Sequence, residues 1–215
     1  MRVVSKIISF LFHPIFMPMF GFLILMSVSV EFLPVMNSEV KTWFIIYQSV
    51  FTIFFPLAYL LLLRFGKSIS SIHLHDRKER IPLFIGSLIF FIIDYVFVRM
   101  APVRLPPIIY AMMLGGIISI LAATIFTFKT KISIHAIGVA GVLGTLFAAG
   151  EHITDHFFMM VENPVFWPIV IVALIAGIVC SARLALQAHS PTQIYLGLVV
   201  GFCALYFPVK FYLVF

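Results

Sequence analysis

Residues 165–193 read VFWPIVIVALIAGIVCSARLALQAHSPTQ and indicate the fold class. Residues 165–182 carry no charged side chain, and this length is close to the roughly 20 apolar residues that cross about 30 Å of hydrocarbon. A polar stretch with Arg183, His189 and Gln193 follows, and residues 192–214 form a second apolar run. The segment therefore predicts two transmembrane helices joined by a short polar connection.

The rest of the chain repeats this pattern. Of its 215 residues, 63% are hydrophobic and only 10% are charged, whereas a soluble domain carries about 25% charged residues. We expect an all-α integral membrane protein with a single domain, residues 1–215, built as a polytopic bundle of six to seven transmembrane helices. The predicted spans are 8–30, 43–63, 82–101, 106–128, 134–150, 165–183 and 192–214.

The first predicted span is irregular. His13-Pro14 and Pro18 interrupt it, and a proline removes a backbone N–H and clashes with the preceding turn of a helix. We expect this segment to be kinked or partly re-entrant, which is why the expected count is six to seven.

The charge distribution suits a membrane protein. The formal charge of +6 comes from lysines and arginines in short connections between apolar runs, where they orient the chain and meet anionic lipid. Seven spans place ten of the fourteen on the side of the N-terminus, which the positive-inside rule assigns to the cytoplasm. Five of these ten belong to the candidate anion site described next, so charge alone leaves the sidedness open. No nucleic-acid partner is expected.

The first polar cluster precedes the span at 82–101. Arg77, Lys78 and Arg80 stand just before Pro82, which suits a first helical position. The cluster can bind an anion. The alternative is a basic patch that anchors the helix to lipid headgroups, and such patches are common.

The second cluster opens the span at 134–150. Ser133 is a good N-cap, which places His135 in the first turn beside Lys131. Unpaired N–H groups and the dipole at a helix N-terminus attract phosphate. The alternative is a histidine at the membrane interface that is bonded to a carbonyl group.

The third cluster is the polar stretch quoted first. Ser190, Pro191 and Gln193 have the signature of a capping box, which starts a new helix. Arg183 and His189 are six residues apart and would point about 240° apart on one continuous helix. The break before Ser190 allows both side chains to face the same point.

Together the clusters favour phosphate chemistry. The helix count puts all three on one side of the membrane, where two histidines supply a nucleophile and a proton donor among several cations. Fixed cations around a phosphoryl group provide the charge stabilisation that its transfer requires.

Arg-x5-His-x3-Gln at 183–193, Lys-x-Ser-x-His at 131–135 and the basic cluster before Pro82 resemble the type 2 phosphatidic acid phosphatase superfamily. The motifs of that family are Lys-x6-Arg-Pro, Pro-Ser-Gly-His and Ser-Arg-x5-His-x3-Asp, on a bundle of about six membrane helices. The third motif matches best, although Gln193 stands in place of the aspartate. Of the second motif, only Ser133 and His135 are present here. The basic cluster before Pro82 does not match the first motif residue for residue.

The resemblance implies a role for each matching residue. His189 corresponds to the nucleophile that forms a phosphohistidine, and His135 to the acid that protonates the departing alkoxide. Gln193 takes the place of the residue that orients the nucleophile. An amide oxygen can fix the imidazole tautomer but cannot stabilise a developing cation as a carboxylate does, so we expect reduced activity. The expected phosphate-binding groups are Arg183, Arg80, Lys78, Arg77, Lys131 and Ser133.

The sequence therefore predicts a metal-independent lipid phosphate phosphatase, with no cofactor, in the inner membrane of a bacterium. Candidate substrates are phosphatidic acid, phosphatidylglycerol phosphate and polyprenyl phosphates. One alternative is a non-catalytic protein that binds or transports lipid phosphates with the same anion pocket. Another is a haem-binding bundle, with His13, His135 and His189 as candidate axial ligands.

Two further features stand outside these clusters. Asp94 lies inside a predicted span, where a carboxylate is costly and often functional. Residues 151–156 contain two histidines and two acids that could bind a divalent metal. The alternative for the second feature, a solvated interface loop, is favoured.

Overall fold

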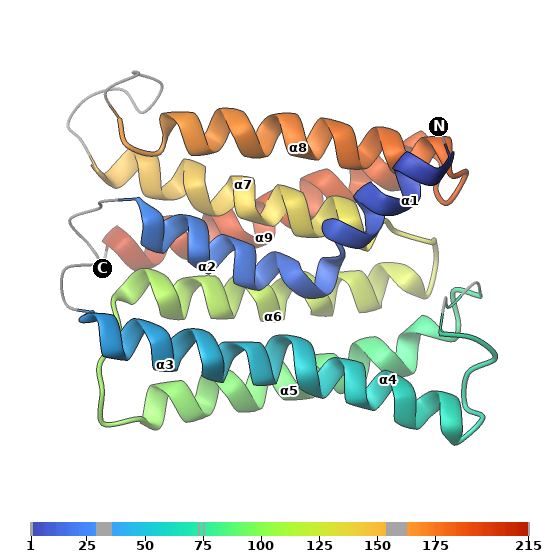
Figure 1. Cartoon of the computed structure of the whole chain (residues 1–215), viewed down its shortest axis with the longest axis horizontal. Helices are drawn as coiled ribbons and strands as arrows, with labels where there is room; N and C mark the ends of the chain where they lie inside the picture. The colour runs from blue at the N-terminus through green and yellow to red at the C-terminus, as the bar shows by residue number, and fades with distance from the viewer. Residues whose placement is uncertain (1, 29–35, 73, 75, 154–162, 215) are drawn as a thin grey trace.

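The computed structural model describes residues 2–28, 36–72, 74, 76–153 and 163–214. Within these ranges the chain is all-helical and contains no strand. Seven helical segments are long and apolar enough to cross a membrane, and they form one bundle (Figure 1). The element bounds are α1 (Arg2–Leu11), η1 (Pro14–Phe16), α2 (Met17–Ser27), α3 (Ser38–Ser49), η2 (Val50–Phe54), α4 (Phe55–Phe65), α5 (Arg80–Met100), α6 (Pro107–Thr127), α7 (Ile134–Ile153), α8 (Phe166–Ala185) and α9 (Pro191–Val214).

The expected spans are confirmed, with small shifts at their ends. The first begins earlier than expected, at Arg2, and is bent as the prolines suggested. The helix stops before His13, a 3-10 turn starts at Pro14, and α2 then continues the span. The Nδ1 atom of His13 caps this turn by accepting the Ile15 N–H at 3.3 Å.

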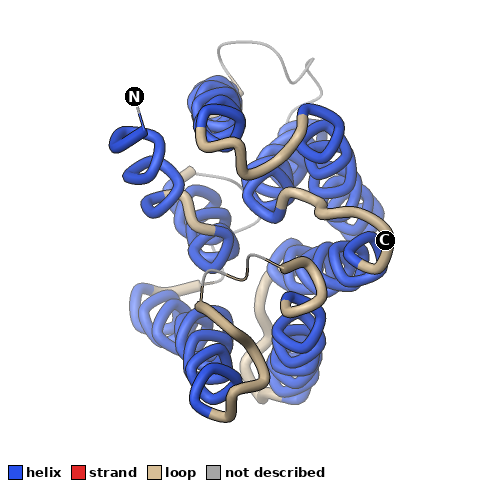
Figure 2. The backbone as a smooth tube through the Cα atoms, turned by 90° about the vertical axis from the view of Figure 1, so that its right-hand side faces the viewer, coloured by secondary structure: helices blue, strands red, loops and turns tan. Residues whose placement is uncertain are grey.

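Helix α7 is the central element of the bundle. In the most apolar stretch of α7, 72% is buried inside the protein, against 17% for the span formed by α3, η2 and α4. Figure 2 shows the helices of the bundle nearly end-on. Since α7 begins one residue after Ser133, the centre of the fold supports the second polar cluster directly.

Helices α7 and α9 touch backbone to backbone through glycines. A Cβ on Gly197 would lie 2.7 Å from the Ser133 carbonyl oxygen, and one on Gly201 would overlap the Ile137 carbonyl group. Small residues spaced in this way let membrane helices approach closely. The contact fixes the start of α9 against the start of α7, where the second and third clusters lie.

A buried polar pair joins α3 to α5 inside the membrane span. Gln48 Nε2 donates to Asp94 Oδ1 at 3.1 Å, and the two residues are 1% and 2% exposed. The π-helical turn η2 begins two residues after Gln48. Asp94 therefore has a neutral partner, which the sequence did not identify.

Candidate functional site

The three polar clusters meet at one end of the bundle. The α4–α5, α6–α7 and α8–α9 connections all lie at the end that carries the N-terminus (Figure 1). Hydrogen bonds join two of them, since Lys131 C=O bonds to His189 and Ser133 N–H donates to the Gln193 carbonyl group at 3.3 Å. The convergence expected from the span count is present.

A sharp turn after α8 positions His189. Gln187 adopts the left-handed backbone conformation with φ of 54°, and the Ala188 N–H bonds back to the Arg183 carbonyl oxygen at 3.1 Å. The chain then enters α9 at Pro191. This break turns His189 into the protein, where its side chain is 7% exposed.

Two oxygen atoms fix the tautomer of His189. Its Nδ1 lies 3.0 Å from the Lys131 carbonyl oxygen and 3.1 Å from Gln193 Oε1. A carbonyl oxygen only accepts hydrogen bonds, so the ring proton is on Nδ1. The amide orientation of Gln193 is consistent, because its Oε1 also accepts the Ser190 N–H at 3.3 Å. The lone pair is therefore on Nε2, the atom with which this imidazole can attack.

The surroundings of His189 keep it neutral. Burial first, and then the positive charges of Arg183 and Arg80, lower its pKa from 6.5 to about 4, although the hydrogen bonds to Gln193 and Lys131 raise it. The pKa of Lys131 is also lowered, by burial and by the same two arginines. The positive charges of Arg80, Lys131 and Arg183 thus lie close together and repel one another.

Among the described residues, these cations have no acidic partner within 4 Å. In the described ranges the one ion pair within 4 Å joins Lys210 to Glu151 at 2.9 Å, at the other end of the bundle. Partly buried charges without a counter-ion are costly. The group formed by Arg80, Lys131 and Arg183 therefore favours an anionic ligand.

His135 is held by the first span. Its Nε2 lies 3.1 Å from the Ser9 carbonyl oxygen, so Nε2 carries a proton, while Nδ1 is buried without a hydrogen-bond partner. The side chain is 6% exposed. This arrangement orients the ring through one nitrogen and leaves the other for a ligand.

Arg183 shares the same anchor residue. Its Nη1 donates to Ser9 Oγ at 3.1 Å, and its Nε is buried with no partner. The rings of His13 and His135 are 5.5 Å apart and nearly perpendicular. Sequence reasoning did not assign Ser9 to the site, and it named His13 only as a candidate haem ligand beside His135 and His189. The His13-Pro14 break in an apolar span was the available signal.

Ser133 and Gln193 stabilise the helix starts. Ser133 is fully buried, and its Oγ accepts the Ala136 N–H at 3.4 Å as an N-cap. Gln193 N–H donates to Ser190 Oγ at 3.4 Å, which completes the expected capping box. Because the Ser133 N–H is bonded to Gln193, its contribution to ligand binding is limited to the hydroxyl group.

The first cluster divides into two parts. Arg80 Nε donates to the Leu74 carbonyl oxygen at 3.1 Å, and the Arg80 charge acts on His189. Arg77 and Lys78 instead line a separate hollow of about 400 Å³ beside Thr127. Their contacts in the described part of the chain do not include His189, His135 or Arg183, so the structure brings together Arg80 but not these two.

Residues 154–162 lie outside the described ranges. The possible metal ligands Asp155 and His156 are among them. The described part of that motif includes Glu151, whose carboxylate pairs with Lys210 and accepts a hydrogen bond from Tyr206 at 2.9 Å. Glu151 therefore already has protein partners.

Comparison with known proteins gives no relative. No protein-family model matches the chain, and neither a curated protein nor a solved structure matches it. The interpretation of the site depends on the contacts described above.

Proposed function

We propose that the protein is a membrane-embedded lipid phosphate phosphatase that works through a phosphohistidine on His189. The observation that carries the proposal is the tautomer of His189. Two oxygen acceptors hold its Nδ1, and the unprotonated Nε2 lies in a region where three cations have no acidic partner among the residues that the structure describes. A neutral imidazole among fixed cations can attack a phosphorus atom whose oxygens those cations hold.

In the first step, His189 Nε2 forms a bond to phosphorus and the bond from phosphorus to the lipid oxygen breaks. The oxygens of the phosphoryl group are held by Arg183, Arg80 and Lys131. His135 takes up a second proton at Nδ1 from solvent when the phosphate binds among the cations, and gives this proton to the departing oxygen, which leaves as a lipid alcohol. The Ser9 carbonyl oxygen stabilises the charged form of His135 by accepting its Nε2–H.

In the second step, water attacks the phosphohistidine. His135, now neutral, takes a proton from the water at Nδ1, and the phosphorus–nitrogen bond breaks. Inorganic phosphate leaves and His189 returns to its starting tautomer. Each proton lost by His135 in the first step is recovered in the second.

The position of the site supports a lipid substrate. The cluster lies at the end of helices that are apolar enough to span a membrane, so the phosphate belongs at the membrane surface with the rest of the molecule in hydrocarbon. Phosphatidic acid, phosphatidylglycerol phosphate and polyprenyl phosphates share this geometry.

The test is phosphate release by the purified protein from vesicles that contain each of these lipids, with His189→Ala beside it. We expect release by the wild type and none by the variant. Brief reaction with a ³²P-labelled lipid followed by an alkaline quench should trap labelled protein in the wild type only. Absence of release from all the lipids would overturn the proposal.

One observation favours a second candidate, a non-catalytic protein that binds or transports lipid phosphates. Both acceptors at His189 Nδ1 are neutral, so no carboxylate stabilises a charge on the ring. In that case His189→Ala would keep binding and the wild type would release no phosphate. Lipid binding and phosphate release, measured on the same two proteins, separate the candidates.

A further inference from the structure

His13 lies beside the candidate site, in the break of the first span, and the proposed reaction does not use it. It follows the last turn of α1, four residues after Ser9. Ser9 already holds two residues of the site, because its carbonyl oxygen lies 3.1 Å from His135 Nε2 and its Oγ accepts from Arg183 Nη1 at 3.1 Å. Residues four apart lie on the same side of a helix, so the turn that carries Ser9 also brings His13 to these groups.

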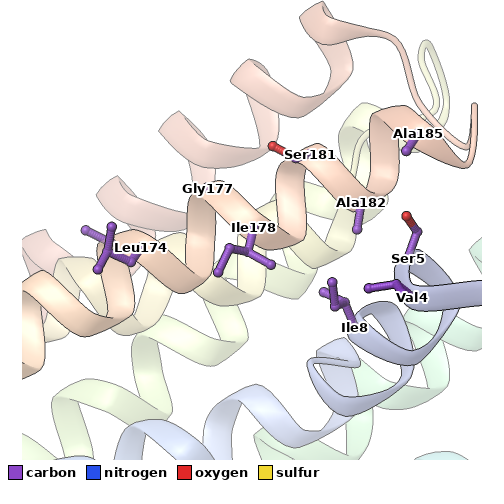
Figure 3. Close-up of a pocket in the computed structure, with 10 residues that line it drawn as sticks. Val4, Ser5, Ile8, Leu174, Gly177, Ile178, Ser181, Ala182 and Ala185 are labelled. Atoms are coloured by element: carbon purple, nitrogen blue, oxygen red, sulfur yellow. The ribbon is translucent and has the colours of Figure 1, made fainter. Parts of the chain in front are cut away.

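The packing of α1 against α8 fixes the position of this turn. Figure 3 shows Ser5 of α1 next to Ala182 of α8. One turn further along α1, Ser9 is hydrogen-bonded to Arg183, the residue that follows Ala182. His13 is therefore held in place by the same pair of helices as Arg183.

The ring of His13 packs against the ring of His135. The ring centroids are 5.5 Å apart, and the ring planes meet at 81°. The charge of Arg183 acts on both rings. Among the described residues, His135 Nδ1 and Arg183 Nε are buried without a hydrogen-bond partner. The break in the first span, α7 and α8 therefore bring three polar side chains together.

One hydrogen bond identifies the tautomer of His13. Its Nδ1 accepts the Ile15 N–H at 3.3 Å, so Nδ1 holds the lone pair and the ring proton is on Nε2. Within the described part of the chain, this Nε2–H group makes no hydrogen bond. The His13 side chain is exposed, whereas that of His135 is 6% exposed. The Nε2–H group is thus a donor that a ligand can reach.

The surroundings of this donor favour an anionic ligand. His13 lies within an apolar span, and an N–H group without a partner is costly in the hydrocarbon region of a membrane. The positive charges of Arg183, Arg80 and Lys131 lie close together at this end of the bundle. A phosphate group meets both conditions, since its oxygens accept hydrogen bonds and carry negative charge. A lipid phosphate and free inorganic phosphate share this chemistry.

We propose that His13 donates its Nε2–H to an oxygen of the phosphate group bound at Arg183. The inference rests on the anion site of the proposed function and adds a neutral phosphate-binding group to its cations. A neutral donor binds an oxygen without adding to the repulsion among Arg183, Arg80 and Lys131. Because a hydrogen bond to a charged group is stronger than one between neutral groups, we expect loss of this donor to weaken phosphate binding about tenfold.

The experiment separates the two nitrogen atoms of His13. An asparagine side chain can replace Nδ1, since its oxygen caps a helix start, but it is too short to replace Nε2. A glutamine side chain is one methylene longer and can place an N–H group near the position of Nε2, at the expense of the cap. His13→Asn and His13→Gln are compared with His152→Asn, the same substitution in the last turn of α7. All three are made in the His189→Ala protein, so that bound lipid is not hydrolysed.

Dissociation constants for short-chain phosphatidic acid and for inorganic phosphate are measured in detergent, together with thermal unfolding midpoints. We expect His13→Asn to raise the Kd of phosphatidic acid about tenfold with little change in midpoint. His13→Gln should lower the midpoint and keep Kd within about threefold of the parent. A parallel increase for inorganic phosphate would show that the phosphate group alone reaches His13. An increase for phosphatidic acid only would show that the tail is needed to place the headgroup there.

An unchanged Kd in His13→Asn would overturn the proposal, and so would an equal loss of binding in His13→Gln or in His152→Asn. If His13→Asn does not fold, His13→Gln decides, because retained binding supports the donor role and lost binding overturns it. Failure of the proposed function gives a different result. A wild type that releases no phosphate can still bind phosphatidic acid through His13.

Discussion

The backbone carbonyl oxygen of Lys131 and the Nδ1 atom of His189 are hydrogen-bonded at 3.0 Å across 58 residues of sequence. A main-chain oxygen cannot be removed by a side-chain substitution, so this contact orients the imidazole whatever residue occupies position 193. Gln193 is then a second acceptor and not the sole one. This changes what substitutions at Gln193 should do.

Gln193→Asp should raise kcat about tenfold. In serine proteases, replacing the aspartate by asparagine lowers the rate by about 10⁴, largely because the histidine takes the wrong tautomer. Here Lys131 already holds the tautomer, so the carboxylate would add only the stabilisation of positive charge. Steady-state phosphate release measures the change, and Gln193→Ala, with a loss of no more than about tenfold, is the control. A loss near 10⁴ in Gln193→Ala would show that Lys131 does not orient the ring.

Phosphate release should persist in mildly acidic solution as far as His189 is concerned. Attack requires the neutral ring, and the pKa of His189 is about 4, so the fraction of competent nucleophile falls only as the pH drops through about 4. Gln193→Asp should move this acid limb to higher pH, because a carboxylate raises the pKa of the ring. A pH profile of single-turnover rates tests both statements. An acid limb near 6.5 in the wild type would contradict them.

The same shift affects stability. The folded pKa of His189 lies below the unfolded value of 6.5, so between about pH 4 and 6.5 the unfolded chain binds more protons. The contribution is fully present above pH 6.5 and is lost as the pH falls toward 4. Thermal unfolding in detergent should show a midpoint that drops across this window, and less so in His189→Asn. Parallel curves for the two proteins would rule out this role.

Arg183→Lys should raise KM at least tenfold with little change in fold. The guanidinium uses Nη1 on Ser9 and keeps a buried Nε without a partner, so it can hold Ser9 and a phosphoryl oxygen together. An ammonium group lacks this planar fork. Lys131→Arg is the matched control and should retain most activity. Equal KM values in the wild type and Arg183→Lys would indicate that Arg183 contributes only its positive charge.

Gly197→Ala should destabilise the protein by about 1–3 kcal/mol, because an overpacked contact must shift backbone atoms. The new Cβ would lie 2.7 Å from the Ser133 carbonyl oxygen and 2.9 Å from the Ala136 Cβ. Gly177→Ala, where a Cβ meets nothing within 4 Å, is the control and should be neutral or stabilising by up to about 1 kcal/mol. Unfolding in detergent compares the two. Similar midpoints would show that the α7–α9 contact is loose.

Gln48→Leu should cost about 1–3 kcal/mol, because it leaves the buried carboxyl group of Asp94 without its hydrogen bond. Asp94→Asn should be tolerated, since an amide can still pair with Gln48. The double variant Gln48→Leu/Asp94→Leu should recover stability relative to Gln48→Leu. Additive losses in this cycle would show that the pair does not interact.

Composition and hydrophobic runs predicted the helices well. The seven spans, the break at His13-Pro14 and the capping box before α9 are local patterns, and each is present. The number of predicted spans also placed the three clusters at one end, because connections separated by an even number of membrane crossings lie on the same side. The spans, the break and the capping box depend on residues that are close in sequence. The placement of the clusters depends on which segments cross the membrane.

Contacts between distant backbone groups were not predictable. The Lys131 and Ser9 carbonyl oxygens orient His189 and His135, yet any residue type provides a carbonyl group. The separation of Arg80 from Arg77 and Lys78 depends on how the turn before α5 lies against α6. Neither the residue types nor their spacing in the sequence predicts these contacts.

The glycine contact between α7 and α9 extends well beyond the site. A Cβ on Gly144 would overlap the Phe202 carbonyl group, about 16 Å along α7 from Ser133. The two helices are thus joined from the start of α7 to its middle as one stiff unit, and the spacing between the two imidazoles depends on that unit. Bilayers of different thickness should tilt it as a unit, and turnover should stay nearly constant where a loop-built site would respond.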